Sequence, residues 1–346
     1  MTNVWIDVRT PKQALIASTL YKELEKEGYN VYVTTRDYDY TISNLKRTGV
    51  EPIVVGGYGE TLKDKLVVEL ERGLKLVDVV LDINPCVLFS YPSPSAARVA
   101  FGLKIKHIVM GDTPHAFAAN RLDFPLADVA IFSSIIMDEM ISYVLTKFTN
   151  VVTYNGVDEL LWIKSFKPDR KVLDSLGLEE KKYVIIRPEE AKAHYYPEDK
   201  PYVLKLVDIV KEHGYTPVVF PRYKDQLGEA KKKEGVIIPT NAVDGPSLEY
   251  FSALVITGGI TMAREAALLG TPAIILFPRK LKADNALRER GFPIYQLNRD
   301  EALKLVNLIL KDPQRYEVDT EPLLSQMESP LPIIIEWIEH LCGKPE

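Results

Sequence analysis

The stretch SALVITGGITMAREAALLGTPAIILFP, from Ser252 to Pro278, contains the pattern that decides the fold. An apolar run, Leu254–Thr257, precedes a Gly-Gly pair and a helix-like segment that carries one arginine and one glutamate. A second apolar run follows Gly-Thr-Pro. This order predicts a buried strand, a tight turn, a helix with Thr261 as its N-cap, and a second parallel strand.

The same alternation of β-branched runs and amphipathic segments continues along most of the 346 residues. Apolar runs separated by helices are typical of parallel strands covered on both faces. In the segment Gln13–Glu27, for example, Ala14, Ala17 and Leu20 belong to a stripe with helical period. Further helices are predicted at Tyr202–His213, Lys280–Gly291 and Pro332–Leu341. The predicted strands are Val4–Val8, Val31–Thr34, Pro52–Val55, Val77–Ile83, Lys106–Met110, Val129–Phe132, Val151–Thr153, Tyr183–Ile186, Thr216–Phe220, Val236–Ile238, Leu254–Thr257, Ala273–Leu276 and Pro293–Tyr295.

The strand–helix order repeats on both sides of the polar stretch KSFKPDRK at Lys164–Lys171. We therefore predict an α/β protein with two doubly wound Rossmann-like domains that face a cleft and are joined near residues 157–170. Residues 1–160 form the first domain and residues 161–325 the second. Residues 326–346 contain a helix with no strand after it, which we expect to pack back on the first domain.

Composition excludes several classes of function. A net charge of −5 and a pI near 5.7 argue against sequence-independent nucleic-acid binding. No apolar run reaches the roughly 20 residues that span a bilayer, and MTNVWIDVRT does not resemble a signal peptide, so we expect a cytoplasmic protein. Cys86 and Cys342 form no CxxC motif, and we expect buried or free thiols there.

The Gly258-Gly259 turn suits a nucleotide diphosphate. Open parallel sheets bind ligands at the carboxyl ends of their strands, where helix N-termini offer free N–H groups. Glycines let a phosphate approach the backbone, and Glu265, one turn into the helix, could then bind a ribose. The alternative is a plain strand-to-helix turn with Glu265 in solvent.

With these residues, TGGITMAREAALLGTPAI resembles the donor-binding segment of GT-B glycosyltransferases and of UDP-N-acetylglucosamine 2-epimerases. The stretches IDVRTPKQALIASTLYKELEKEGYNVYVTTRD, SPSAARVAFGLKIKHIVMGDTPHA and YVIIRPEEAKAHYY resemble an archaeal family of unknown function within that superfamily. The resemblance covers nearly the whole chain and implies the GT-B fold.

The resemblance also implies roles for individual residues. The glycine turn, Gly258 and Gly259 with Thr261, would contact the diphosphate, and Glu265 the ribose. Arg187 stands where relatives often keep a basic residue for phosphate, a group that the planar guanidinium suits; the alternative is a surface ion pair with Glu189 or Glu190. Arg264 either joins it at the phosphate or only solvates the helix.

The first domain should supply the acceptor site and any catalytic base. In MGDTPHAF, Asp112 and His115 follow a predicted strand directly, at the carboxyl edge of the sheet. His115 could deprotonate an acceptor hydroxyl while Asp112 orients it. The alternative is an Asp N-cap of the turn that follows, with His115 packed in the loop.

Three other motifs have structural interpretations. The first strand-to-helix loop carries Arg9, Lys12 and Gln13 where many inverting relatives keep histidine, which weakens a base there. The Asp-x-Asp of RDYDY (36–40) and the glycines of GGYG (56–59) each follow a predicted strand, and we interpret both as loops. No His/Cys/Asp cluster has metal-ligand spacing, so we expect neither a metal nor a cofactor.

Three functions remain open. The first is a metal-independent GT-B glycosyltransferase that uses a nucleotide-diphosphate sugar, with UDP as the expected nucleotide. The second is a UDP-N-acetylglucosamine 2-epimerase, which we rank lower because SYPSPS and VMGDTPHA replace the epimerase pattern. The third is a non-catalytic protein that binds nucleotide, RNA or a protein partner. The resemblance to epimerases, which are often dimers, also leaves a homodimer open.

Overall fold

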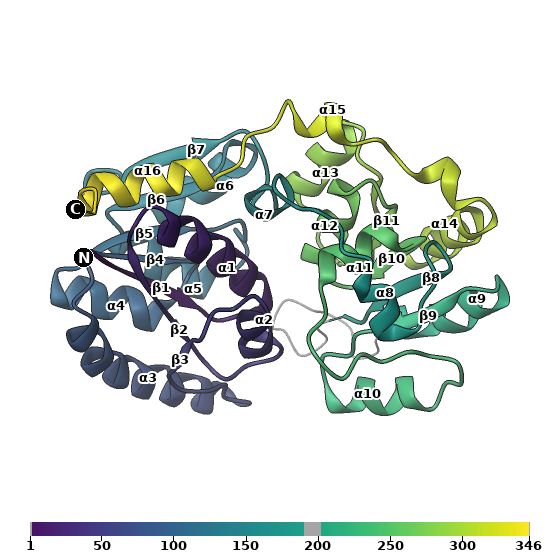
Figure 1. The fold of residues 1–346 in the computed structure, drawn as a ribbon, viewed down its shortest axis with the longest axis horizontal. Coiled ribbons are helices and arrows are strands. Elements are labelled where there is room, and N and C mark those ends of the chain that lie inside the picture. Colours follow the sequence, from purple (N-terminus) through teal and green to yellow (C-terminus); the bar gives the residue numbers. More distant parts are fainter. Residues whose placement is uncertain (1, 190–201, 346) are drawn as a thin grey trace. The chain divides into compact units, whose positions relative to one another are not determined.

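The computed structural model describes residues 2–189 and 202–345 and divides them into two compact units (Figure 1). Unit 1 comprises residues 1–162 and 328–346, and unit 2 comprises residues 163–327. The chain therefore completes most of unit 1, forms unit 2, and then returns to unit 1 for its last helix. Each unit has its own parallel sheet, as the repeated strand–helix order predicts.

Unit 1 is built on a seven-stranded parallel sheet in the order β3-β2-β1-β4-β5-β6-β7. Helices α3 and α4 pack on the face that contains Trp5 and Leu88, while α1 and α16 contact each other and α16 contacts β4 and β5. The strands are β1 Asn3–Val8, β2 Asn30–Thr35, β3 Ile53–Val54, β4 Val87–Ser90, β5 Lys106–Met110, β6 Val129–Ser133 and β7 Asn150–Tyr154. The main helices are α1 Pro11–Lys26, α2 Thr41–Arg47, α3 Leu62–Ile83, α4 Pro94–Leu103, α5 Phe117–Asp123, α6 Met137–Met140, α7 Leu160–Ile163 and α16 Leu331–Cys342.

The predicted strand Val77–Ile83 is wrong, because these residues are the last two turns of the 22-residue helix α3. The helix begins with a capping box between Thr61 and Asp64 and ends at Asn84 in the left-handed conformation. Within Val77–Ile83, apolar and acidic residues alternate almost as they do in a strand. The actual strand there is β4, Val87–Ser90, which the sequence analysis missed because it is short.

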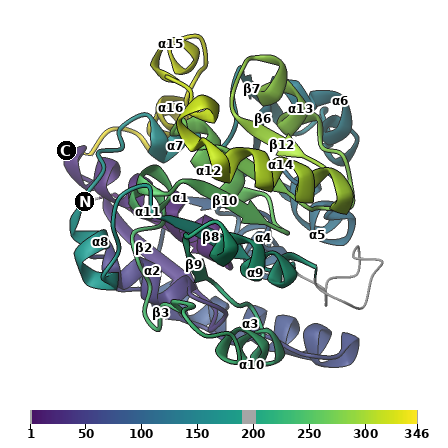
Figure 2. The ribbon, with the colours of Figure 1, turned by 90° about the vertical axis from the view of Figure 1, so that its right-hand side faces the viewer.

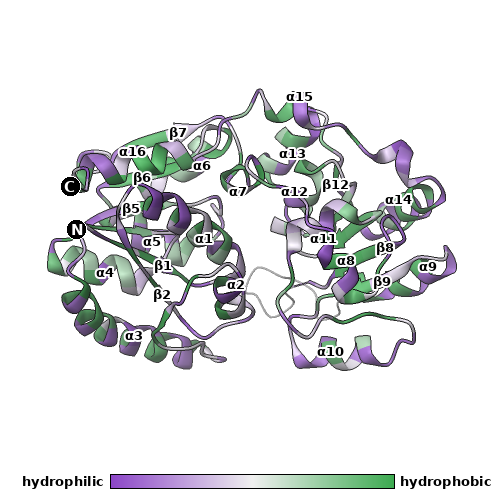
Figure 3. Ribbon diagram, viewed as in Figure 1, coloured by the Kyte–Doolittle hydropathy of each residue, from purple (hydrophilic) through white to green (hydrophobic). Residues whose placement is uncertain are grey.

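Unit 2 is built on a five-stranded parallel sheet in the order β12-β11-β10-β8-β9. Helices α9 and α14 contribute to one buried core with the strands, whereas α11 and α12 pack together and α12 contacts β10 and β11 (Figure 2). Strands β8 and β10 are buried along their whole length, and β8 is largely green in Figure 3. The strands are β8 Tyr183–Arg187, β9 Thr216–Val219, β10 Leu254–Thr257, β11 Ala273–Ile275 and β12 Ile294–Gln296. The helices are α8 Lys171–Leu176, α9 Leu206–Glu212, α10 Lys224–Lys231, α11 Gly245–Phe251, α12 Thr261–Leu268, α13 Lys282–Glu289, α14 Arg299–Lys311 and α15 Glu321–Leu324.

Two local predictions in unit 2 need correction. Val236–Ile238 forms only an isolated bridge from Ile237 to Val218 and not a strand. Thr261 is the first residue of α12 and not its N-cap; Ile260 takes that position and gives no side-chain hydrogen bond to the helix. The amides of the first turn of α12 are therefore not capped by a side chain of the N-cap residue.

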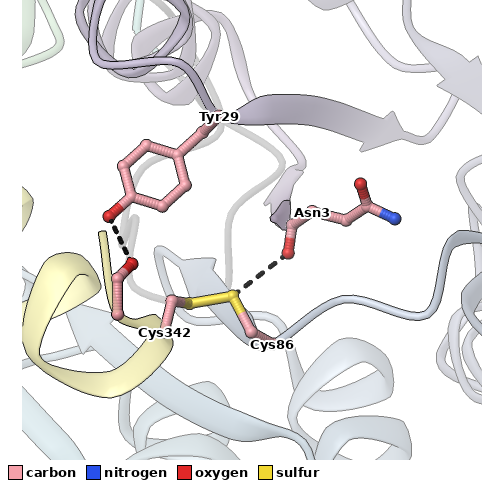
Figure 4. Close-up of a disulfide and its surroundings, with 5 residues drawn as sticks. Asn3, Tyr29, Cys86 and Cys342 are labelled. Carbon is pink, nitrogen blue, oxygen red and sulfur yellow. Dashed lines mark hydrogen bonds between the residues drawn. A yellow bond between two sulfur atoms is a disulfide. The ribbon is translucent and has the colours of Figure 1, made fainter. Parts of the chain in front are cut away.

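The last helix, α16, belongs to unit 1 and is fastened there by a disulfide (Figure 4). It buries Ile334 and Ile338 and ends at Cys342, which is bonded to Cys86 just before β4. The Tyr29 hydroxyl donates a hydrogen bond of 3.0 Å to the Gly343 carbonyl beside this bond. The expectation of buried or free thiols is therefore wrong, because topology brings together two cysteines that are 256 residues apart.

No helix among the described residues is both long and apolar enough to cross a bilayer.

The disulfide gives a prediction about stability. Reduction with a phosphine should lower the free energy of unfolding by about 2–5 kcal/mol, because the bond closes a long loop in the unfolded chain. Urea unfolding with and without reductant measures the effect. A double variant, Cys86→Ser with Cys342→Ser, should match the reduced wild type and ignore reductant. Equal stability of oxidised and reduced wild type would show that the bond contributes nothing.

Candidate functional site

Polar side chains gather at the carboxyl edge of the unit 1 sheet. Because all seven strands are parallel, the residues that follow them meet at this edge. Lys12 lies in the first turn of α1 after β1, Tyr91 directly follows β4, Asp112 follows β5, and Asp158 follows β7. Thr10 caps α1 with a side-chain hydrogen bond to the Gln13 amide, and so fixes the start of the helix that carries Lys12.

The Lys12 ammonium lies among three carboxylates. Its Nζ is 2.6 Å from Asp112 Oδ2 and 3.3 Å from both Asp158 Oδ2 and Glu159 Oε1. The side chains of Asp158 and Glu159 are fully buried, whereas those of Lys12 and Asp112 remain 12% and 10% exposed. Asp112 is thus the carboxylate of this acidic cluster that solvent and a substrate can reach.

Two buried tyrosines complete the cluster. The Tyr91 hydroxyl lies 2.6 Å from Asp158 Oδ2, makes a short hydrogen bond to Asp112 Oδ1, and accepts one of 2.8 Å from the Asp112 amide. Tyr154 donates to the other oxygen of Asp158. Burial and the neighbouring carboxylates raise the pKa of both tyrosines well above the ordinary value, so both remain protonated donors.

Burial raises the pKa of Asp158 to about 6, although the nearby Lys12 ammonium lowers it and Asp112 and Glu159 raise it further. The Tyr91 hydroxyl has one proton but lies within hydrogen-bond distance of two carboxylates. A proton on the Asp158 carboxyl would supply the second hydrogen bond, donated to the Tyr91 hydroxyl oxygen. The cluster can therefore take up and release a proton close to neutral pH.

The loop after β5 places both predicted residues at this edge. Asp112 accepts a hydrogen bond from Thr113 Oγ1 as well as its bonds from Lys12 and Tyr91. It does not cap the following helix, because Ala116 is the N-cap of α5. His115 is partly exposed in the same loop. The structure therefore assigns a definite set of partners to Asp112, and its catalytic role, like that of His115, stays a prediction.

In unit 2 the glycine turn lies where β10 ends, at the carboxyl edge of the second sheet. A Cβ atom on Gly258 would lie 2.5 Å from the Glu189 Cα, so this glycine is required by close packing. A Cβ on Gly259 would lie 2.8 Å from Arg222 Nη2 instead. Neither glycine has a positive φ, so both serve close approach and not an unusual backbone conformation.

Two arginines belong to this end of unit 2. Arg187 is the last residue of β8 and is 8% exposed. A surface ion pair with Glu189 is wrong, because Glu189 is fully buried and accepts hydrogen bonds from the Tyr202 and Val203 amides. Glu190 lies outside the described residues. Arg222, which follows β9, approaches the glycine turn and was missed by the sequence analysis.

The helix after the turn places its two charged residues inside unit 2. Arg264 is 1% exposed and its Nε donates to Asp284 Oδ1 at 2.5 Å, so it does not solvate the helix. Its role at the phosphate stays a prediction. Glu265 is 3% exposed and not in solvent. After burial, Glu265 is the largest cause of the raised pKa of Glu249 on the adjacent helix α11.

The acidic cluster does not fit a resident divalent cation. Lys12 occupies the place between the carboxylates where a cation would bind, and each of them already contacts the ammonium. Over residues 2–189 and 202–345, no group of three or more His, Cys, Asp or Glu side chains has the arrangement of a metal site.

Sequence reasoning missed Tyr91, Asp158 and Glu159. Asp158 and Glu159 fall within residues 157–170, which the pattern identified as the link between domains. The signal that could have found them is their position four and five residues after the end of strand β7. Tyr91 follows β4, which the sequence analysis missed.

Comparisons with known proteins agree with this architecture. Residues 2–339 match the family described as "Protein of unknown function (DUF354)". The uncharacterized protein MJ0665 of Methanocaldococcus jannaschii is 32% identical over 288 residues, which cover 81% of this chain and 83% of that protein.

Similar solved structures show the fold. A Neisseria meningitidis UDP-GlcNAc 2-epimerase bound to UDP-GlcNAc has a TM-score of 0.74 at 13% identity, covering 98% of this chain and 100% of that one. The M. jannaschii UDP-GlcNAc 2-epimerase in complex with UDP-GlcNAc and UDP gives 0.71 at 16%, with 98% and 100% covered. The spinosyn forosaminyltransferase SpnP gives 0.63 at 15%, with 99% of each chain covered. The predicted GT-B fold is confirmed.

The proton on Asp158 gives a prediction about pH. A carboxyl whose pKa is raised from 3.8 to about 6 on folding stabilises the protein below pH 4, and this stability is lost as pH rises toward 6. The free energy of unfolding of Asp158→Asn, taken relative to that of wild type, should therefore increase by on the order of 2 kcal/mol between pH 4 and pH 7. Urea unfolding across this range measures the difference. Asp78→Asn, at an exposed position of α3, is the control. A difference that stays constant with pH would contradict the assignment.

Proposed function

We propose that this chain, which belongs to the DUF354 family, is a glycosyltransferase that uses a nucleotide-diphosphate sugar as donor. The observation that carries the proposal is the Asp112 carboxylate, partly exposed at the carboxyl edge of unit 1 and held at 2.6 Å by Lys12. A carboxylate with a fixed orientation and access to solvent is suited to act as a general base toward an acceptor hydroxyl.

In the proposed reaction, the acceptor hydroxyl gives its proton to Asp112 as its oxygen bonds to the sugar C1. The bond from C1 to the diphosphate oxygen breaks, and the electron pair leaves with the diphosphate. Lys12 is a positioning residue that holds the Asp112 carboxylate in one orientation before the reaction. Asp158 can accept the proton afterwards through Tyr91, because the hydroxyl lies between the two carboxylates. His115 is the second candidate base.

The donor belongs to unit 2. There the uncapped N-terminus of α12, the close approach allowed by Gly259, and the Arg222 guanidinium offer positive groups for a diphosphate. Gly258, Thr261 and Arg187 complete the proposed phosphate side, and Glu265 is the proposed ribose ligand. These cationic groups would stabilise the leaving diphosphate, so we propose that the transfer proceeds without a bound metal. UDP is the proposed nucleotide, and we propose a cytoplasmic location.

A 2-epimerase is the second candidate, and the acidic cluster favours it. Exchange of a proton at C2 of a sugar needs groups that can take and return a proton. The three carboxylates around Lys12, with one pKa of about 6, could serve that chemistry. The two functions differ in one simple respect: only an epimerase forms a new nucleotide sugar in the absence of an acceptor.

Glu265 and Glu249 form a matched pair for testing the donor site. Both carboxyls are buried and interact with one another, so either change to glutamine replaces one carboxyl of the pair. If Glu265 binds a ribose, Glu265→Gln should weaken UDP binding about tenfold to a hundredfold, the usual effect of losing a charge-assisted hydrogen bond. Glu249→Gln should leave the affinity unchanged. Calorimetric titration with UDP measures all three proteins.

The outcomes distinguish the two interpretations of the glycine turn, as part of a nucleotide site or as a purely structural turn. Equal affinity of wild type, Glu265→Gln and Glu249→Gln would remove Glu265 from the site and leave a purely structural turn. Absence of UDP binding by the wild type would contradict UDP as the nucleotide. Thermal unfolding of each variant confirms that the compared proteins are folded.

A further inference from the structure

Two sequence motifs that we interpreted as loops lie together in unit 1. The segment 36–40, RDYDY, follows β2, and the segment 56–59, GGYG, follows β3. The Asp37 amide donates to the Gly56 carbonyl at 3.0 Å, and the Tyr38 and Tyr58 rings lie 4.6 Å apart. The two loops therefore form one structure at the carboxyl edge of the sheet.

The Arg36 guanidinium lies against both rings. Its Cζ is 4.8 Å from the centre of the Tyr38 ring and 5.3 Å from that of Tyr58. Tyr58 is 44% exposed, and the Lys65 ammonium lies 5.3 Å from the centre of its ring. Two cations and two aromatic rings thus lie together in one partly exposed cluster.

Two carboxylates beside these loops are paired with other arginines, and the exposed Asp37 and Asp39 form no ion pair with Arg36. Arg9 contacts Glu69 at 2.6 Å, and the buried Arg72 contacts Asp7 at 2.5 Å. Arg36 makes no ion pair with any side chain of residues 2–189 or 202–345, and its Nε donates only to the Arg9 carbonyl at 3.3 Å. The buried Arg9 Nε also has no hydrogen-bond partner in the described chain. Arg36 and Arg9 therefore keep N–H donors that no described residue accepts.

A half-buried cation is costly unless it is paired, and the Glu69 carboxylate, which favours the charged form of Arg36, forms its ion pair with Arg9. Burial and the neighbouring Arg9 lower the pKa of Arg36 to about 10, yet it remains charged at neutral pH. Stacking on tyrosine offsets part of the cost. An oxyanion would offset much more, because a planar guanidinium forms paired, charge-assisted hydrogen bonds with phosphate or carboxylate.

We propose that Arg36, Arg9 and Lys65, with Tyr38 and Tyr58, bind an oxyanion group, a phosphate or a carboxylate, of the acceptor. That the anion belongs to the acceptor rests on the proposed transferase function; the oxyanion site itself does not. The strand order β2-β1-β4-β5 separates this site from Asp112 by three strand spacings, roughly 14 Å at about 4.8 Å each. The acceptor then extends beyond a single sugar ring, with its anion at β2 and its reacting hydroxyl at β5.

The test uses the full chain with inorganic phosphate, glucuronate and, as neutral control, glucose, with UDP present at saturation. Calorimetry should show that wild type binds phosphate or glucuronate but not glucose, and the stronger of the two identifies the oxyanion. Arg36→Gln should weaken that binding at least tenfold, and Arg36→Lys should retain more of it. Arg288→Gln is the matched control, because Arg288 also lies over a tyrosine ring, that of Tyr295, at 4.0 Å.

A second readout distinguishes a binding role from a structural one. Without ligand, Arg36→Gln should unfold at the same or a higher temperature than wild type, because it removes an unbalanced charge. A lower unfolding temperature with unchanged anion affinity would overturn the proposal and make Arg36 a stacking residue. Absence of phosphate and glucuronate binding by the wild type would overturn it as well. If the wild type binds phosphate or glucuronate but does not bind UDP, the result counts against the transferase function and not against this oxyanion site.

Discussion

The ammonium of Lys12 is the group on which the acidic cluster of unit 1 depends. Three carboxylates and two tyrosine hydroxyls converge there, and Lys12 is within 3.3 Å of every carboxylate. Buried acids of this kind repel one another strongly unless a cation or a proton separates them. The cluster contains both, an ammonium in its centre and a carboxyl, Asp158, whose pKa is about 6. Asp112 owes its fixed orientation, and hence its suitability as a base, to this arrangement.

At the corresponding sheet edge of unit 2, the constraint is the close packing around the glycine turn. Gly258 is required because the Glu189 backbone passes beside it, and Glu189 in turn holds the start of the segment after residue 202. Gly259 is the glycine that leaves room for a charged group, at present the Arg222 side chain. Gly258 is therefore required by backbone packing as well as being part of the proposed phosphate site, whereas the close neighbour of Gly259 is a side chain. A sequence motif alone cannot separate these roles.

The sequence was sufficient to predict the fold where a segment had a clear strand pattern or a clear helix pattern. β5 and β10 have the predicted bounds, because each contains a short apolar run with a turn after it. Prediction failed where a pattern had two interpretations: the alternating end of α3 resembled a strand, and residues 157–170, which include Asp158, resembled a linker. The Cys86–Cys342 bond depends on topology that no local pattern contains. For the same reason Asp112 could be placed at an edge, whereas its partners Lys12, Tyr91 and Asp158 could not be assembled.

The most direct test of the account asks whether Asp112 performs transfer and not exchange at C2. Wild type and Asp112→Asn would be incubated with UDP-N-acetylglucosamine in D₂O without an acceptor, and the products followed by proton NMR. The account predicts slow release of UDP to water by the wild type, about a hundredfold or more slower release by the variant, and no deuterium at C2. Deuterium at C2 of the nucleotide sugar, or equal release by the two proteins, would contradict it.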